Sequence, residues 1–227
     1  ALAPKPQPVD NKSLTINNAS LSTVSQVTPS AVLPPAGVLP TIDLSKDVVK
    51  FTQESREIIF NPVTASIVDV IFKGGTEHHL PLKIGFLTDV NLVFKQHALT
   101  KDSISFIAED QSQRIVKKFI IPNNSHTIEL DIQIQNLSSS PLALNQQLIL
   151  GRLDLSAKNP QARYQDIYLN NKEKTMHLAA GKDFNSPDVK FIGLRDQYFC
   201  TIIEPVNLAG SAYVKKILPY YFISFQF

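Results

Sequence analysis

The sequence is poor in the residues on which disulfide, metal and phosphate chemistry depend. Cys200 is the only cysteine among 227 residues, which excludes an internal disulfide framework and a zinc site built from several thiolates. Only 8 glycines occur, so few places exist where backbone could wrap closely around a phosphate group. The sequence motifs of nucleophile elbows, phosphate-binding loops, dinucleotide folds and zinc peptidases are all missing. We therefore predict no catalytic residue, no cofactor and no metal site.

Neither sign of charge is in large excess. The 22 basic and 20 acidic residues are scattered along the chain and give a formal net charge of +2. No strong field is available to attract phosphate backbones, so nucleic-acid binding has little electrostatic support. With 43% hydrophobic residues, however, the chain can bury one large core, which argues against a disordered protein.

A long apolar run is absent as well. No stretch is long enough to cross a bilayer, and Ala1–Pro6 has neither the charged nor the apolar region of a signal peptide. We interpret the chain as a piece of a longer protein whose membrane-targeting or anchoring element lies outside it. Residues 1–45 are rich in Pro, Ser and Asn and are predicted to form a flexible linker that limited proteolysis would remove.

From residue 46 to residue 227, short strand-like runs alternate with turn residues. The clearest run is Thr127–Asn136, where every second residue is Ile or Leu and the others are polar. Together with Ile115–Ile121 and the turn at Pro122–Ser125, it predicts a β-hairpin with one buried and one exposed face. No helical stripe of similar quality is present. We predict an all-β fold, an antiparallel β-sandwich of two large sheets.

The histidines are the first candidates for ligand or base chemistry. His78 and His79 follow Gly74-Gly75 and are predicted to be solvated turn residues rather than metal ligands. The other three stand alone near predicted loops or strand ends, and we assign them no chemistry: His97, His126 and His177.

The charged pairs have ordinary structural interpretations. Glu109-Asp110 falls in a predicted turn, and Glu129 and Asp131 lie on the polar face of a strand, so none is predicted to be a general acid or base. We expect the basic pairs Lys117-Lys118 and Lys215-Lys216 to lie on the surface of hairpins.

Two apolar runs near the end of the chain predict core strands. Tyr220–Phe227 is dense in aromatic residues and is predicted to pack on both faces, with an aromatic groove for an extended ligand as the alternative. Phe191–Pro205 is predicted to be central in a sheet, which would make Cys200 a small buried hydrophobic residue with a slowly reacting thiol.

The Phe191–Pro205 segment also resembles a known family. An aromatic residue, a glycine and a Tyr-Phe pair precede an apolar strand that ends near a proline, as in the large periplasmic domain of the YidC-type membrane protein insertases of Gram-negative bacteria. Arg56–Val70, Leu80–Leu82 and Ile115–Leu137 resemble that domain in the same order. The residues that carry the main match are Phe191, where the family typically has Trp, and Gly193, Tyr198, Phe199 and Pro205.

The resemblance implies a β-supersandwich at residues 46–227, cut short at its C-terminal end, since the family has more strands after the position of Pro205. It implies a non-catalytic accessory or docking domain on the periplasmic face of the bacterial inner membrane, anchored by segments outside this chain. The partners it implies are the accessory subunits of the Sec translocon and nascent membrane proteins. Insertion chemistry itself belongs to membrane helices that this chain does not contain.

Two alternatives from other classes stay open. The insertase domain itself resembles sugar-binding supersandwich folds such as the galactose mutarotases, so the chain could be a carbohydrate-binding or mutarotase-like protein. Mutarotases use paired histidines and a carboxylate in a cleft, and the sequence shows no recognisable version of that arrangement. The other alternative is a structural or adhesive surface domain.

Overall fold

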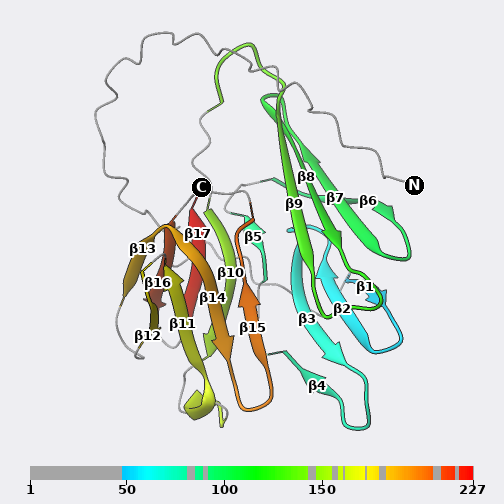
Figure 1. Cartoon of the computed structure of the whole chain (residues 1–227). Coiled ribbons are helices and arrows are strands. Elements are labelled where there is room, and N and C mark those ends of the chain that lie inside the picture. The colour runs from blue at the N-terminus through cyan, green and yellow to red at the C-terminus, as the bar shows by residue number, and fades with distance from the viewer. Residues whose placement is uncertain are drawn as a thin grey trace, which may run out of the picture.

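The computed structural model describes most of the β region. The described residues are 48–80, 85–88, 92–142, 147–154, 158–160, 162–171, 173–178, 183–206, 211–217 and 220–226. The predicted linker, residues 1–45, lies outside them. In the described part every sheet is antiparallel and the one helical element is a single 3-10 turn, so the predicted all-β fold is confirmed (Figure 1). None of the helical structure described could span a membrane.

Two four-stranded sheets form the first β-unit. Their inner faces enclose a cluster of buried apolar residues, in which the Phe60 ring lies 4.9 Å from the Phe119 ring and 5.6 Å from the Phe106 ring. The sheets have the orders β1-β2-β3-β4 and β6-β7-β8-β9. Their strands are β1 (Val49–Thr52), β2 (Arg56–Asn61), β3 (Ser66–Phe72), β4 (His78–His79), β6 (Lys95–Leu99), β7 (Ser103–Glu109), β8 (Gln113–Ile120) and β9 (Glu129–Asn136).

The second β-unit contains a five-stranded and a four-stranded sheet around its own core. The five-stranded sheet has the order β13-β16-β17-β10-β5, and the other has the order β12-β11-β14-β15. The elements are β5 (Leu87–Thr88), β10 (Gln147–Asp154), the 3-10 turn η1 (Ala162–Tyr164), β11 (Asp166–Asn171), β12 (Thr175–Leu178), β13 (Phe184–Pro187), β14 (Val189–Arg195), β15 (Cys200–Ile203), β16 (Ser211–Ile217) and β17 (Tyr220–Gln226).

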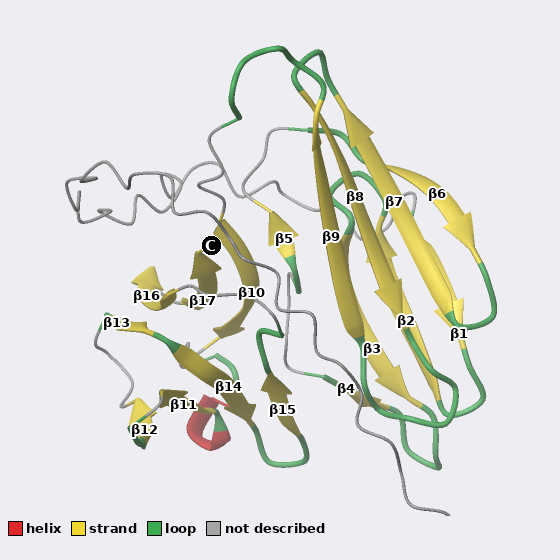
Figure 2. Cartoon of the chain, turned by 45° about the horizontal axis from the view of Figure 1, so that its top comes forward, coloured by secondary structure: helices red, strands yellow, loops and turns green. Residues whose placement is uncertain are grey.

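The two units stand side by side and share part of their packing (Figure 2). Four partly buried side chains contact both cores: Leu80, Phe86, Leu130 and Ile132. Two of them come from β9, whose apolar face looks toward the second unit. Leu130 and Ile132 are half-buried where the two cores meet.

The predicted hairpin is confirmed, with two differences in its second strand. β8 pairs with β9 in the expected register, Ile115 opposite Ile134 and Phe119 opposite Leu130. The strand begins at Glu129 rather than at Thr127. Its apolar side chains were expected to be fully buried, and they are half-buried instead, while the polar Gln133 between them is exposed.

The C-terminal aromatic run is a core strand, as expected. Tyr221, Phe222, Ile223 and Phe225 are all buried on β17, and they face two different apolar clusters. Because these side chains are enclosed, they do not offer an open groove to an extended ligand.

The prediction for Phe191–Pro205 is wrong in its second half. β14 lies inside its sheet and buries Ile192 and Leu194, but β15 is the edge strand of the described sheet. Cys200 is exposed and Ile202 is 63% exposed. An apolar run alone does not distinguish a central strand from an edge strand, because sheet order depends on residues far away in the sequence.

The prediction of a surface location for Lys117-Lys118 is wrong for one member of the pair. Lys118 is exposed, whereas Lys117 is 0% exposed and lies on the same strand face as Ile115 and Phe119. Its Nζ donates a hydrogen bond to the Phe86 carbonyl oxygen. Burial lowers the pKa of Lys117 from 10.5 to about 7, because a charged ammonium loses its hydration in the core.

Candidate functional site

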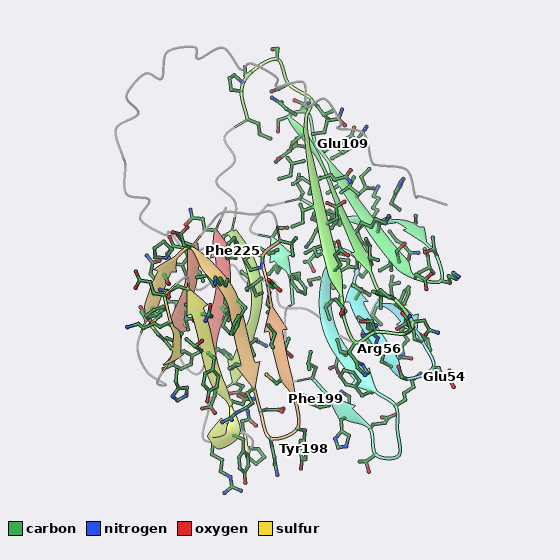
Figure 3. The ribbon with its side chains drawn as sticks, in the orientation of Figure 1. Glu54, Arg56, Glu109, Tyr198, Phe199 and Phe225 are labelled. Carbon is green, nitrogen blue, oxygen red and sulfur yellow. The ribbon has the colours of Figure 1, made fainter. Side chains whose placement is uncertain are left out.

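The five residues that carry the family resemblance gather in and around the β14–β15 hairpin. Phe191 is half-buried and Gly193 is buried on β14, and Pro205 is half-buried just after β15. Tyr198 and Phe199 lie at the hairpin tip, next to β4 (Figure 3). Nothing in this arrangement makes them a single binding site, because they occupy different faces and positions of the hairpin.

The tip of the hairpin is held by its own aspartate. Asp196 Oδ1 accepts hydrogen bonds from the backbone N–H groups of Tyr198 at 2.8 Å and Phe199 at 2.6 Å, and the Asp196 N–H donates to the Phe199 carbonyl at 2.9 Å. Aspartate favours such turns because its short side chain can accept from backbone groups two and three residues later. The turn thereby fixes the direction of both aromatic side chains.

Phe199 anchors the hairpin to the first β-unit. Its ring stacks on Phe72 of β3, with centroids 5.0 Å apart and planes inclined by 23°. Tyr198 is 60% exposed and lies 5.3 Å from the His78 ring. The tip therefore forms an aromatic contact between the two units rather than a polar site.

The outer face of the β12-β11-β14-β15 sheet carries a different set of side chains. Strand register places Asp166 opposite Arg195 and Tyr168 opposite both His177 and Gly193. Gly193 in turn lies opposite Ile202. Side chains alternate along β11, and Ile167 and Leu169 enter the core, so Asp166 and Tyr168 are on the outer side. We call this surface the polar sheet face and define it by Asp166, Tyr168, His177, Gly193, Arg195 and Ile202.

Asp166 is the hub of the polar sheet face. Its Oδ1 lies 3.1 Å from Nε2 of His177, and its Oδ2 accepts a hydrogen bond from a guanidinium nitrogen of Arg195. Partial burial acts to raise the pKa of Asp166, but the hydrogen bonds and positive charges of Arg195 and His177 outweigh it and lower the pKa. The hydrogen bond to Asp166 raises the pKa of Arg195. At neutral pH the face thus holds a fixed carboxylate and a fixed guanidinium.

Next to Asp166 and Arg195 lies an apolar surface formed by Tyr168 and Ile202, which we call the floor of the polar sheet face. The Tyr168 ring lies 5.0 Å from the His177 ring, and the Arg195 guanidinium lies 5.6 Å from the Tyr168 centroid. Gly193 places no side chain between Tyr168 and the exposed Ile202, and a Cβ added there would lie 3.5 Å from Tyr168 Cβ. A larger side chain at position 193 would fill this space.

The adjacent histidines are placed differently from the prediction. His78 and His79 lie on the short strand β4, not in a turn, and on opposite faces of it. His79 Nδ1 lies 2.8 Å from Asp69 Oδ2, while His78 faces the aromatic hairpin tip. His126 packs edge-on against Phe72, and His97 is exposed on β6. In the part of the chain that the structure describes, no three His, Cys, Asp or Glu side chains gather as a metal site would require.

Sequence reasoning missed the Asp166–His177 pair. The two residues are 11 positions apart, and Arg195 is 29 positions from Asp166. Only the pairing of β11 with β12 and with β14 brings the three together. No local motif marks such a set, so His177 was interpreted as standing alone.

Comparison with known proteins gives a fold and no close relative. No family model matches the chain, and no curated protein does. A candidate aldose 1-epimerase from Escherichia coli K12 superposes with a TM-score of 0.56 and 9% identity, covering 79% of this chain and 87% of that one. A galactose mutarotase-like protein from Lactobacillus casei superposes with a TM-score of 0.54 and 7% identity, with the same coverages.

These structures correct the functional expectation. Both proteins are named for sugar chemistry, one as an aldose 1-epimerase and the other as a galactose mutarotase-like protein. These neighbours contradict the main expectation, a non-catalytic docking domain of an insertase, and the expectation that the chain is not an enzyme. The mutarotase-like alternative agrees with these neighbours. The sequence resemblance to the insertase domain, with the partners and location that it implies, stays a prediction. The chain has the antiparallel β-supersandwich fold of the mutarotase-like proteins.

Proposed function

We propose that this chain binds an aldose on the polar sheet face and interconverts its two anomers. The observation that carries the proposal is the Asp166–His177 pair, which lies next to Arg195 and beside an aromatic floor on a mutarotase-like fold. A base held by a carboxylate, next to a cation, can supply the proton transfers that open and close a sugar ring.

The floor suits the shape of a pyranose ring. One side of such a ring presents C–H groups, which pack against aromatic and aliphatic surfaces such as Tyr168 and Ile202. Gly193 is buried beneath its neighbours, so the ring would rest on the Tyr168 and Ile202 side chains rather than on the backbone of the sheet. The sugar hydroxyls would then meet Asp166 and Arg195, whose charges strengthen hydrogen bonds.

The proposed reaction moves one proton and needs no co-reactant. His177 Nε2 faces Asp166, so in the neutral imidazole that nitrogen carries the proton and Nδ1 is free to accept one. His177 takes the proton of the anomeric hydroxyl, the bond between C1 and the ring oxygen breaks, and an aldehyde forms. The imidazolium returns the proton to the ring oxygen, whose developing negative charge Arg195 stabilises. Rotation about C1–C2 and the reverse steps close the ring as the other anomer.

The test measures anomer exchange and sugar binding separately. The exchange between anomers of freshly dissolved α-D-glucose and α-D-galactose is followed by proton NMR with the wild-type chain, with His177→Gln and with His97→Gln. His97→Gln is the control, because His97 is an exposed residue of the first unit. We expect His177→Gln to lower the catalysed rate by about 100-fold or more while sugar binding remains, because general base catalysis contributes on that order. The control is expected to keep the wild-type rate. Equal rates in the wild-type chain and His177→Gln would overturn the assignment of the base, and a wild-type chain that neither binds nor accelerates any aldose would overturn the proposed function.

A further inference from the structure

The chain crosses between the two β-units through a four-residue segment, Gly85–Thr88. Gly85 and Ile67 of β3 form a two-hydrogen-bond bridge, N–H to carbonyl at 2.8 Å in each direction. Immediately afterwards, Leu87 and Thr88 form β5 and pair with β10 of the second unit. The segment is therefore attached to one sheet of each unit within four residues.

Phe86 stands between these two attachments in a restricted conformation. Its φ is 64°, in the left-handed region that side chains with a Cβ rarely adopt. Its side chain contacts both apolar cores, and its ring lies 6.2 Å from that of Phe119. Such a conformation persists only when the surroundings hold it in place.

Lys117 supplies one of the groups that hold it. The Nζ of this fully buried side chain donates to the Phe86 carbonyl oxygen and lies 5.5 Å from the centre of the Phe94 ring. On the neighbouring strands its partners in register are Phe106 and Ile132, both apolar.

No described carboxylate faces this ammonium group. The acidic residues of β7 and β9 lie at exposed positions or on the opposite strand face: Glu109, Glu129 and Asp131. Arg56, the other fully buried cation in the described ranges, differs in having a side-chain acceptor, Gln53 Oε1 at 2.8 Å, in addition to the Pro122 carbonyl at 3.2 Å. A buried charge costs solvation energy that a side chain such as methionine would avoid. What lysine provides here and methionine cannot is the hydrogen bond to the Phe86 carbonyl oxygen of the crossing segment.

We propose that Lys117 is an internal latch that fixes the Gly85–Thr88 crossing and, through it, the packing of the two β-units against each other. The latch acts at one place, where the cores of the two units meet. It does not depend on what the polar sheet face binds.

Amide hydrogen exchange of the full chain tests the latch. Lys117→Met removes the donor and keeps an unbranched apolar side chain of similar length, and Lys118→Met makes the same change at the adjacent exposed position. We expect the bridge amides of Ile67 and Gly85 to exchange at least about tenfold faster in Lys117→Met than in Lys118→Met, because local opening loses one of its restraints. Amides between β16 and β17 are expected to exchange equally in both variants. Unchanged protection of Ile67 and Gly85 would overturn the proposal.

A second measurement covers the case in which Lys117→Met does not fold. In the wild-type chain, NMR is used to detect the coupling across the hydrogen bond between the Lys117 Nζ and the Phe86 carbonyl carbon. A detectable coupling supports the latch. Its absence, together with a freely exchanging Lys117 amine, would overturn it.

Discussion

At the scale of single residues, position 117 shows how a strand pattern can place a charge in the core. Ile115, Lys117 and Phe119 occupy alternate positions, so whichever face buries the two apolar residues also buries the lysine. The sequence contains this signal, but a Lys-Lys pair is normally a surface feature, and the expectation followed the pair rather than the alternation. The result is an ammonium group with a strongly lowered pKa.

The lowered pKa predicts an unusual pH dependence of stability. In the unfolded chain Lys117 holds its proton up to about pH 10.5, whereas in the folded chain it releases the proton near pH 7. Between these values the unfolded state binds more protons, so the free energy of unfolding rises with pH, by at most about 1.4 kcal/mol per pH unit from this group. Urea unfolding at pH 7 and pH 9.5 measures the slope.

The Lys117→Met variant provides the comparison for this slope. Because methionine does not titrate, we expect its free energy of unfolding to rise less between these two pH values than that of the wild-type chain. Lys118→Met is expected to follow the wild-type chain. Parallel pH profiles for all three proteins would contradict the burial of a titrating lysine.

Cys200 is predicted to react readily in the folded protein. It is the only cysteine and lies exposed on the edge strand β15, so a thiol reagent can reach it without unfolding. We expect the native chain to be labelled within about tenfold of the rate of the urea-unfolded chain. A colorimetric thiol assay gives both rates. If Cys200 is labelled only after denaturation, the thiol is buried, as the sequence had suggested.

Gly193 tests the floor of the polar sheet face. A valine there suits a strand, but its side chain would occupy the space between Tyr168 and Ile202. If the proposed function holds, Gly193→Val abolishes aldose binding in an NMR titration while changing the free energy of unfolding by less than about 1 kcal/mol. If a folded Gly193→Val variant binds the aldose as tightly as the wild-type chain does, the sugar does not bind on this face.

At the scale of elements, the β14–β15 hairpin depends on its turn. Asp196 accepts two backbone hydrogen bonds there, and the turn presents Phe199 to Phe72. We expect Asp196→Ala to lower the free energy of unfolding by about 1 kcal/mol, in the range typical of lost side-chain-to-backbone bonds. Asp196→Asn keeps an acceptor oxygen and is expected to lose much less. Urea denaturation compares the two variants, and equal losses would argue against a role for the acceptor.

At the scale of the whole molecule, the two β-units are joined by shared apolar contacts. Ile132 lies on β9 and contacts both cores, whereas its neighbour Gln133 is exposed. We expect Ile132→Ala to cost about 1–3 kcal/mol, less than for a fully buried residue, and Gln133→Ala to cost under about 0.5 kcal/mol. Chemical denaturation measures both. Similar costs at the two positions would contradict the one-sided packing of β9.

The sequence by itself determined the kind of structure this chain forms. Alternation with a period of two is a local property, so it predicted the β8–β9 hairpin, the one-sided pattern of β9 and the buried strand at Tyr220–Gln226. The absence of helical stripes pointed to the same all-β fold. These inferences succeeded because each rests on residues within a few positions of one another.

Only the tertiary structure decided which residues meet. Strand register set Asp166 against both His177 and Arg195, and sheet order left Cys200 at an edge instead of in a core. The crossing at Gly85–Thr88 gave the Lys117 ammonium a carbonyl partner 31 positions away. Each of these outcomes depends on pairing between distant strands. A two-residue period fixes the face on which a side chain lies but carries no information about the strand that lies beside it.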